Sequence, residues 1–376
     1  MKRILLSLVA TLLCSTTLTA QELPSRGEIL EVMKRTNDYL MQSRYPDPTA
    51  VMPYPSRKRN YESNIWTRAV YYEGLMALYS ISPENRYYEN AVQWAEFHKW
   101  GMRRDDTTTR NADNYCCGQT YIDLYRLEPR PERLRKICSL CNMLVATPQV
   151  EDWTWIDAIQ MGMPVLAKMS AVTGDPRYYE KAHQMYLWSR NTLAGGLFNE
   201  KEGLWWRDKD FVAPYREPNG EDCYWSRGNG WVVAALVRVL QELPADAPQC
   251  KLYRKDLRTM CAALKRCQRA DGAWNVSLHD PDHFGGKEIS GTALFVYGMA
   301  WGINNGLLDR AEYLPVVIKG WEALVSAVHP NGFLGYVQGT GKEPKDGQPV
   351  GYDTTPDFED YGLGCLLLAG SEVYKL

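Results

Sequence analysis

The sequence has no excess of charge of either sign. Its 376 residues carry 43 lysines and arginines against 45 aspartates and glutamates, which gives a formal net charge of −2. No run of five or six like charges marks an interaction tail. A nucleic-acid-binding protein would show a basic patch or stripe, so the balance argues against a nucleic-acid partner.

Long apolar runs are also absent after the first twenty residues, which argues against stable membrane insertion. At the N-terminus, Lys2 and Arg3 precede an apolar run over residues 4–13 that is too short to span a bilayer. Ala20 then supplies the small residue expected before a cleavage site. We expect residues 1–20 to be a signal peptide and the protein to be exported, with the periplasm favoured because Leu13 before Cys14 does not fit a lipidation site.

The chain lacks a linker rich in proline, glycine or serine, so we expect one domain over residues 21–376. It also lacks a second CxxC or an HxxxH to complete a zinc site with Cys138 and Cys141. Nine cysteines remain after signal removal, and we expect most to be buried small apolar residues. His279 and His283 flank two aspartates in a loop that fits a plain turn better than a metal site. We therefore predict no metal and no cofactor.

Apolar residues recur at helical spacing in about twelve segments, which predicts an all-α protein. Helices with many small and apolar residues alternate with amphipathic ones, six of each. This alternation fits an (α/α)6 barrel of six hairpins, with an open superhelix of helix pairs as the alternative. The expected spans are 27–43, 66–81, 85–100, 113–127, 130–147, 155–173, 176–192, 226–242, 251–269, 289–306, 311–327 and 359–375.

Polar and aromatic residues collect at the starts of the even-numbered helices. If those helices are the inner ring of antiparallel hairpins, they all point the same way and these residues surround one mouth of the barrel. Among these residues, in chain order, are Asn64, Trp66, Asn111, Asp113, Trp153, Trp155, Asp157, Trp225, Arg227, Trp231, Glu288, Ser290 and Asp357.

Aromatic rings and carboxylates at one mouth are what a sugar site requires, because the rings pack on pyranose faces and carboxylates move protons. Arg227 favours an acidic sugar, since a guanidinium binds a carboxylate bidentately. Each residue also has a structural alternative: Asp113 and Ser290 suit helix caps, Arg227 suits a salt bridge and the tryptophans suit a core. For Asp157 we favour function, because a carboxylate on an apolar inner helix is rarely buried without a reason.

At these residues the sequence resembles glycoside hydrolase family 105, the unsaturated rhamnogalacturonyl hydrolases. The resemblance runs from about Trp66 to the C-terminus, and the related unsaturated glucuronyl hydrolases share the fold and both carboxylates. It rests on four motifs in the family's order, which are Asn111-Ala-Asp113-Asn-Tyr, Asp152-Trp-Thr-Trp-Ile-Asp157-Ala, Trp225-Ser-Arg-Gly-Asn-Gly-Trp231 and Glu288-Ile-Ser-Gly-Thr-Ala293.

The resemblance implies release of a terminal 4,5-unsaturated uronic acid from an acidic, lyase-generated oligosaccharide. Asp157 would protonate C4 and help activate the water that adds at C5, and Asp113 would hold the ring and assist the water. The implied substrate-binding residues are Trp66, Trp155, Arg207, Trp225, Arg227, Trp231 and Glu288. Arg207 is a departure, because members that prefer rhamnogalacturonan tend to have histidine in its loop. The parent polysaccharide and the oligomeric state therefore stay open.

Two other functions fit parts of the pattern. One is a conventional inverting glycosidase or a sugar epimerase on the same barrel. An epimerase would rely on inward histidines, yet none of the five histidines lies on a helix expected to face inward. The other is a non-catalytic carbohydrate-binding protein, which would keep the aromatic residues without needing Asp157.

Overall fold

The structure, a computed structural model, describes residues 22–54, 58–356 and 360–376. The predicted signal peptide and Asp357 lie outside these residues. The α-helices are α1 (Arg26–Asp38), α2 (Trp66–Ile81), α3 (Asn85–Phe97), α4 (Ala112–Tyr115), α5 (Gly118–Leu127), α6 (Glu132–Val145), α7 (Asp157–Thr173), α8 (Arg177–Asn191), α9 (Ser226–Leu240), α10 (Gln249–Arg266), α11 (Ile289–Asn304), α12 (Arg310–Ser326) and α13 (Asp360–Val373).

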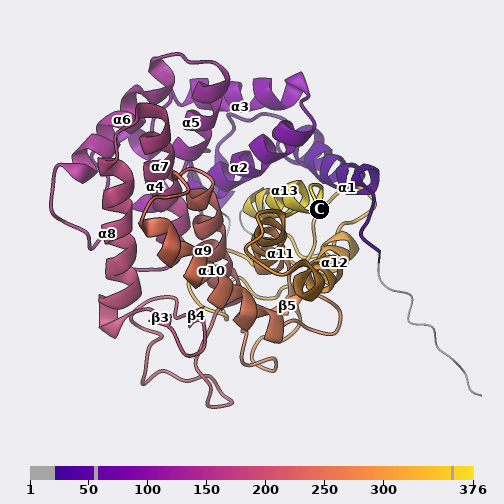
Figure 1. The fold of residues 1–376 in the computed structure, drawn as a ribbon. Coiled ribbons are helices and arrows are strands. Elements are labelled where there is room, and N and C mark those ends of the chain that lie inside the picture. Colours follow the sequence, from indigo (N-terminus) through magenta and orange to yellow (C-terminus); the bar gives the residue numbers. More distant parts are fainter. Residues whose placement is uncertain (1–21, 55–57, 357–359) are drawn as a thin grey trace, which may run out of the picture.

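The helices form two concentric rings (Figure 1). The inner ring closes through contacts of α2 with α5, α5 with α7, α7 with α9, α9 with α11, α11 with α13, and α13 with α2. Helices α1, α3, α6, α8, α10 and α12 pack outside it. With α4 and α5 counted as one interrupted helix, this is the predicted (α/α)6 barrel. In the part of the chain that the structure describes, no helix is long and apolar enough to cross a membrane.

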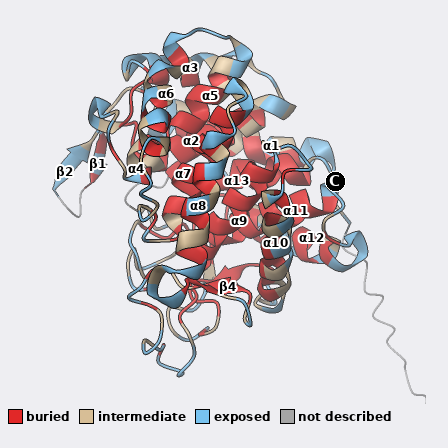
Figure 2. Cartoon of the chain, turned by 60° about the vertical axis from the view of Figure 1, so that its left-hand side comes forward, coloured by how far each residue is buried: buried red, intermediate tan, exposed pale blue. Residues whose placement is uncertain are grey.

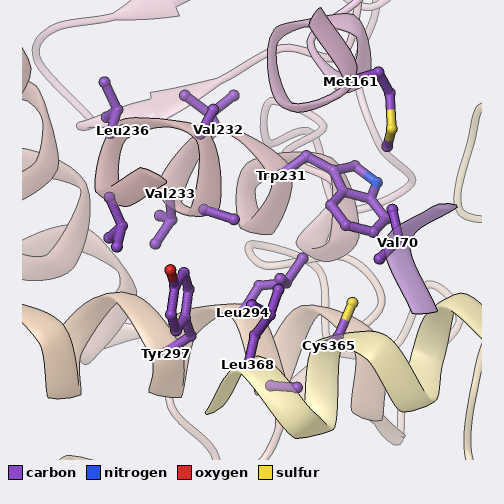
Figure 3. Close-up of a cluster of buried hydrophobic side chains, with 14 of the residues drawn as sticks. Val70, Met161, Trp231, Val232, Val233, Leu236, Leu294, Tyr297, Cys365 and Leu368 are labelled. Atoms are coloured by element: carbon purple, nitrogen blue, oxygen red, sulfur yellow. The ribbon is translucent and has the colours of Figure 1, made fainter. Parts of the chain in front are cut away.

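Burial separates the two rings as the alternation in the sequence predicts. Every residue of α9 is buried, whereas α10 exposes one face to solvent (Figure 2). Inside the ring, Trp231 of α9 extends between Met161 of α7 and Val70 of α2, above Leu294 and Cys365 (Figure 3). The interior of the barrel is therefore a packed apolar core, which holds the inner helices in fixed positions.

Two glycines allow the ring to close between α2 and α13. A Cβ atom on Gly74 would lie 2.4 Å from the carbonyl oxygen of Gly364, and one on Gly364 would lie 2.2 Å from that of Val70. Both obstacles are backbone atoms, so no side chain can move to make room. The close crossing of α2 and α13 thus requires glycine on both helices.

The structure corrects one predicted helix and adds short strands. The span 113–127 is interrupted at Cys116 and Cys117, where the amide of Gln119 donates to the carbonyl of Cys116 at 3.0 Å in a tighter i,i+3 turn. Three antiparallel hairpins, too short to show alternation in the sequence, pair β1 (Met52–Tyr54) with β2 (Arg59–Tyr61), β3 (Phe198–Asn199) with β4 (Leu204–Trp205), and β5 (Trp274–Asn275) with β6 (Lys287–Glu288).

The cysteines of the described part of the chain are all free, and seven of the nine are buried. The prediction that most of them serve as small apolar core residues is confirmed. Cys138 and Cys141 on α6 form no metal group with other histidine, cysteine or acidic side chains of the described residues.

Candidate active site

A cavity of about 250 Å³ opens at the N-terminal ends of the inner helices. The C-terminal ends of these helices line a separate cavity at the other end of the barrel. The inner helices are therefore parallel, as the sequence argument requires. The active-site cavity is lined by Tyr54, Tyr61, Ile65, Trp66, Arg103, Asp113, Trp155, Asp157, Met161, Arg207, Thr340 and Gly341.

Asp113 lies in this cavity at the start of α4. The helix is capped by Asn111, whose side-chain oxygen accepts from the Asp113 amide at 2.9 Å. The Asp113 carboxyl is therefore not used as the cap and is left to the cavity. Its pKa is raised to about 7, first by burial and then by the neighbouring Asp157 carboxyl, while Arg207 and Arg103 oppose the shift.

Asp157 is the first residue of α7 and shares the cavity with Asp113. Its Oδ2 atom lies 3.6 Å from Nε of Arg207, and neither atom has a hydrogen-bond partner among the described residues. Burial raises the pKa of Asp157, whereas the positive charges of Arg207 and Arg227 lower it. Two carboxyl groups with raised pKa values in one cavity are the arrangement that general acid catalysis needs.

Arg207 is positioned by the segment that follows β4. Its carbonyl accepts from the amide of Ile156 at 2.9 Å, which ties it to the start of α7. Its Nη1 atom donates to Asp208 at 2.5 Å, and Asp208 forms a β-bridge with Trp155. Backbone and side-chain contacts together aim the Arg207 guanidinium into the cavity beside Asp157.

Trp66 and Trp155 give the cavity its aromatic wall, as predicted. The Trp66 ring lies 5.3 Å from the ring of Tyr361 and meets Trp231 edge-on at 6.1 Å. Trp231 itself is fully buried and does not line the cavity, and it packs against Trp66 on the core side. A sugar ring in the cavity would contact Trp66, which these buried rings hold in place.

Trp225, Arg227 and Glu288 were predicted to bind substrate, but they are buried behind the cavity. Arg227 donates to the carbonyl oxygens of Gln338 and Gly339 at 3.0 and 3.1 Å and to the Tyr361 hydroxyl at 2.6 Å. The Trp225 indole donates to the Gln338 side chain at 2.9 Å. The loop over residues 335–351 therefore covers the start of α9.

The Glu288 carboxylate is used within its own helix. It caps α11 by accepting from the amides of Ser290 and Gly291 at 2.9 and 2.7 Å. Glu288 is thus the cap of this helix, a role the sequence argument gave to Ser290. A capping carboxylate with both oxygens occupied is not free to contact a ligand.

Arg103, Tyr54, Tyr61 and Thr340 also line the cavity, and the sequence argument missed them. Arg103 lies in a loop between α3 and α4, the two tyrosines lie on the β1–β2 hairpin, and Thr340 lies in the 335–351 loop. The Tyr54 hydroxyl and Thr340 Oγ1 are 2.9 Å apart, so the hairpin and the loop meet over the cavity. Of these residues, only Tyr54 and Tyr61 could have been found from the sequence, because they are aromatic residues shortly before the start of an inner helix, α2.

The loop that contains His279, Asp280, Asp282 and His283 does not line the active-site cavity. Glu217, Asp280 and His283 gather within ligand distance of one another. Asp280 accepts the amides of Asp282 and His283 at 3.1 and 3.0 Å, and His283 contacts Glu217 at 3.2 Å. The carboxylates of Asp280 and Glu217 thus have hydrogen-bond partners within the loop, and the amides bonded to Asp280 form the turn that the sequence predicts.

Comparison with known proteins relates the whole barrel to one family. The family described as Glycosyl Hydrolase Family 88 matches residues 32–376. The "Unsaturated 3S-rhamnoglycuronyl hydrolase" of Formosa agariphila is 30% identical over 331 residues, covering 83% of this chain and 84% of that protein. A protein of the same name from an Alteromonas species is 30% identical and covers 86% and 80%.

Two solved structures are similar over nearly the whole chain. The "Glycosyl hydrolase family 88 from Bacteroides vulgatus" has 32% identity and a TM-score of 0.84, covering 94% of this chain and all of that one. A protein named "Polysaccharide Lyase BACCELL_00875" has 32% identity and a TM-score of 0.83, covering 93% and 97%. One of these two names denotes a hydrolase and the other a lyase.

Proposed function

The chain belongs to glycosyl hydrolase family 88, and we propose that it releases a terminal 4,5-unsaturated uronic acid from lyase-generated oligosaccharides. The observation that carries this proposal is the cavity that holds Asp113, Asp157 and Arg207 together. At about 250 Å³ it is smaller than the roughly 300–1,000 Å³ of pockets for drug-sized ligands. Such a cavity suits the single terminal ring of a chain.

The chemistry follows from the enol ether at C4 and C5. Asp157, with its raised pKa, gives its proton to C4, and the positive charge that develops at C5 is shared with the ring oxygen. A water molecule bonds to C5 and returns a proton to the Asp157 carboxylate. The hemiketal at C5 then opens to a ketone by breaking its bond to the ring oxygen, and the hemiacetal left at C1 releases the next sugar.

The other residues of the cavity bind and orient the ring. Arg207 is the cation beside Asp157, so it pairs with the uronate carboxylate. Trp66 packs against the ring, and Asp113 accepts from a ring hydroxyl and assists the water. This scheme breaks no bond by direct displacement at the anomeric carbon, which is why it does not need the two carboxylates of an ordinary glycosidase at a fixed separation.

A lyase is the second candidate, because one similar structure carries that name. A lyase needs a base to remove the proton at C5 of a saturated uronate inside a polymer. The raised pKa values of Asp113 and Asp157 suit a proton donor and a base alike. The small cavity, which suits one terminal ring, favours the hydrolase over an enzyme that acts inside a polymer. An epimerase that relies on histidine receives no support, because none of the five histidines lines the cavity.

One assay separates these functions. Purified protein is mixed with lyase-generated oligosaccharides and, separately, with the intact polysaccharide, and the ultraviolet absorbance of the enoate is followed. The hydrolase predicts decay with the oligosaccharides and no change with the polymer. A rise with the polymer identifies a lyase instead, and unchanged absorbance in both reactions contradicts both functions.

We also propose that the protein is exported to the periplasm. The support is the basic start, short apolar run and small residue at Ala20 in the sequence. Cell fractionation followed by N-terminal sequencing tests it. Periplasmic protein that begins near Gln21 is expected, and full-length protein in the cytoplasm would contradict the proposal.

A further inference from the structure

Three arginines gather at the rim of the active-site cavity. The guanidinium carbons of Arg59 and Arg103 lie 4.8 and 4.7 Å from the centre of the Tyr61 ring. Arg104 follows directly in the chain, and none of the three forms an ion pair with an acidic side chain of the described residues. Burial lowers the pKa of Arg103, and the positive charges of Arg104 and Arg59 lower it further. The Glu62 carboxylate opposes this shift, but it is one negative charge against three positive ones, so the rim keeps an excess of positive charge.

This arginine cluster, Arg59, Arg103 and Arg104, is continuous with the catalytic cavity. Tyr61 and Arg103 line that cavity and also a neighbouring hollow of about 240 Å³. The rest of the hollow is formed by Arg59, Asn60, Glu62 and Arg104. A ligand whose terminal ring lies beside Asp157 can therefore extend past Arg103 into the hollow.

The turn that carries Arg103 and Arg104 is fixed by backbone geometry and a backbone hydrogen bond, so their guanidinium groups are not needed to form it. Arg104 has a φ angle of 60° and Asp105 one of 54°, so this turn keeps two non-glycine residues in the left-handed region. Glu62, the acidic residue of the hollow, accepts from the backbone amide of Arg104 at 2.9 Å. Arg103, the member of the cluster that lines the catalytic cavity, donates one side-chain hydrogen bond among the described residues, to the Asn114 side-chain oxygen at 3.5 Å.

We propose that this arginine cluster is a subsite for an anionic group, a sulfate ester or a carboxylate, on the sugar that follows the terminal unsaturated uronate. Arginine is the side chain best suited to this, since its planar donors match the oxygens of both groups. The cavity binds the uronate through Arg207 at its floor, and the rim binds the second anion. The inference rests on the proposed hydrolase function and assigns its substrates a second negative charge.

The test compares three unsaturated disaccharides that differ only in the second sugar, which carries a sulfate ester, a carboxylate or no charge. The enoate decay gives kcat/KM for each with the wild-type protein. We expect kcat/KM for at least one anionic disaccharide to exceed that for the neutral one by roughly tenfold. The disaccharide with the higher value shows whether the subsite binds a sulfate ester or a carboxylate. Equal values for all three, or a preference for the neutral sugar, overturn the subsite.

Variants then assign the preference to the cluster. The double substitution Arg59→Gln and Arg104→Gln should lower the ratio of anionic to neutral kcat/KM roughly fivefold, because exposed charges are partly screened. A matched control replaces two exposed arginines of the outer helices, Arg135→Gln and Arg258→Gln, and should leave the ratio unchanged. An unchanged ratio in the first variant, or an equal fall in the control, overturns the assignment. Absence of decay with every disaccharide would instead mean that the proposed hydrolase function has failed, and the subsite with it.

Discussion

Nε of Arg207 lies 3.6 Å from Oδ2 of Asp157, and neither atom has a hydrogen-bond partner among the described residues. Buried polar atoms are rarely left unpaired unless a ligand or water meets them. The pair lies where an acidic sugar would enter, with a cation for the carboxylate and an acid for the double bond. The incomplete pairing is thus a feature of the binding site and not of the fold.

The first prediction concerns the charge of Arg207. Replacing it with glutamine removes a positive charge that lowers the pKa values of both Asp157 and Asp113. Both carboxyls then keep their protons to higher pH, so the alkaline limb of the kcat/KM profile should move to higher pH. The maximum should fall roughly tenfold because the uronate loses its cation. A limb that stays in place or moves to lower pH would show that Arg207 does not act on the catalytic acid.

The second prediction concerns the stability cost of Asp113. Its pKa of about 7 in the folded state lies above the ordinary value of 3.8, so its contribution to stability is present at low pH and is lost as the pH rises through about 7. The variant Asp113→Asn has no proton to lose. It should exceed the wild type in free energy of unfolding by on the order of 2 to 4 kcal/mol at roughly pH 8, and by little at roughly pH 4.

Urea unfolding at the two pH values measures this difference. Asp210→Asn, at an exposed position beside the cavity loops, is the control and should show no comparable gain. If Asp113→Asn is no more stable than the wild type at the higher pH, the surroundings of Asp113 do not raise the pKa of its carboxyl group.

The third prediction separates two arginines that the sequence treated alike. Arg227 binds the carbonyl oxygens of Gln338 and Gly339, so Arg227→Met leaves buried acceptors unpaired and should cost about 3 kcal/mol of unfolding free energy. It should also raise KM, because the 335–351 loop loses its anchor. Arg207→Met should reduce activity with little loss of stability. Equal stability of the two variants in thermal unfolding would contradict the assignment of Arg227 to the loop.

The fourth prediction concerns closure of the barrel. Gly74→Ala brings a Cβ atom to 2.4 Å from a backbone oxygen on α13, and the helices cannot separate without opening the ring. We expect a loss of about 3 kcal/mol in unfolding free energy. Gly27→Ala is the matched control, since its nearest neighbour is 3.9 Å away, and it should be neutral or gain up to about 1 kcal/mol. Similar stability of the two variants would contradict the backbone contact as the cause.

The sequence predicted the barrel well because helix period and alternating burial are local patterns. Helices such as α2, α7 and α9 begin at the predicted residues or within two of them. The same logic placed Asp113, Asp157, Trp66 and Trp155 at one mouth, since parallel inner helices bring their starting residues together. The resemblance to unsaturated uronyl hydrolases agrees with the family 88 match and with the names of the two curated relatives.

The depth of each residue at that mouth could not be predicted. Arg227, Trp225 and Glu288 also lie at helix starts, but the 335–351 loop covers them, and the path of a long loop leaves no periodic signal. The same loop and the β1–β2 hairpin bring Thr340, Tyr54 and Tyr61 to the cavity from segments without helical pattern. Contacts made by loops thus decided which predicted residues face the ligand.

The most direct test of the central claim uses two oligosaccharides that differ only in the double bond of the terminal uronate. Release of the second sugar is measured by chromatography for the wild type and for Asp157→Asn, with retained folding checked by circular dichroism. The account predicts release from the unsaturated substrate alone and a loss of at least 100-fold in the Asp157→Asn variant. Equal release from the saturated substrate, or wild-type activity in Asp157→Asn, would contradict it.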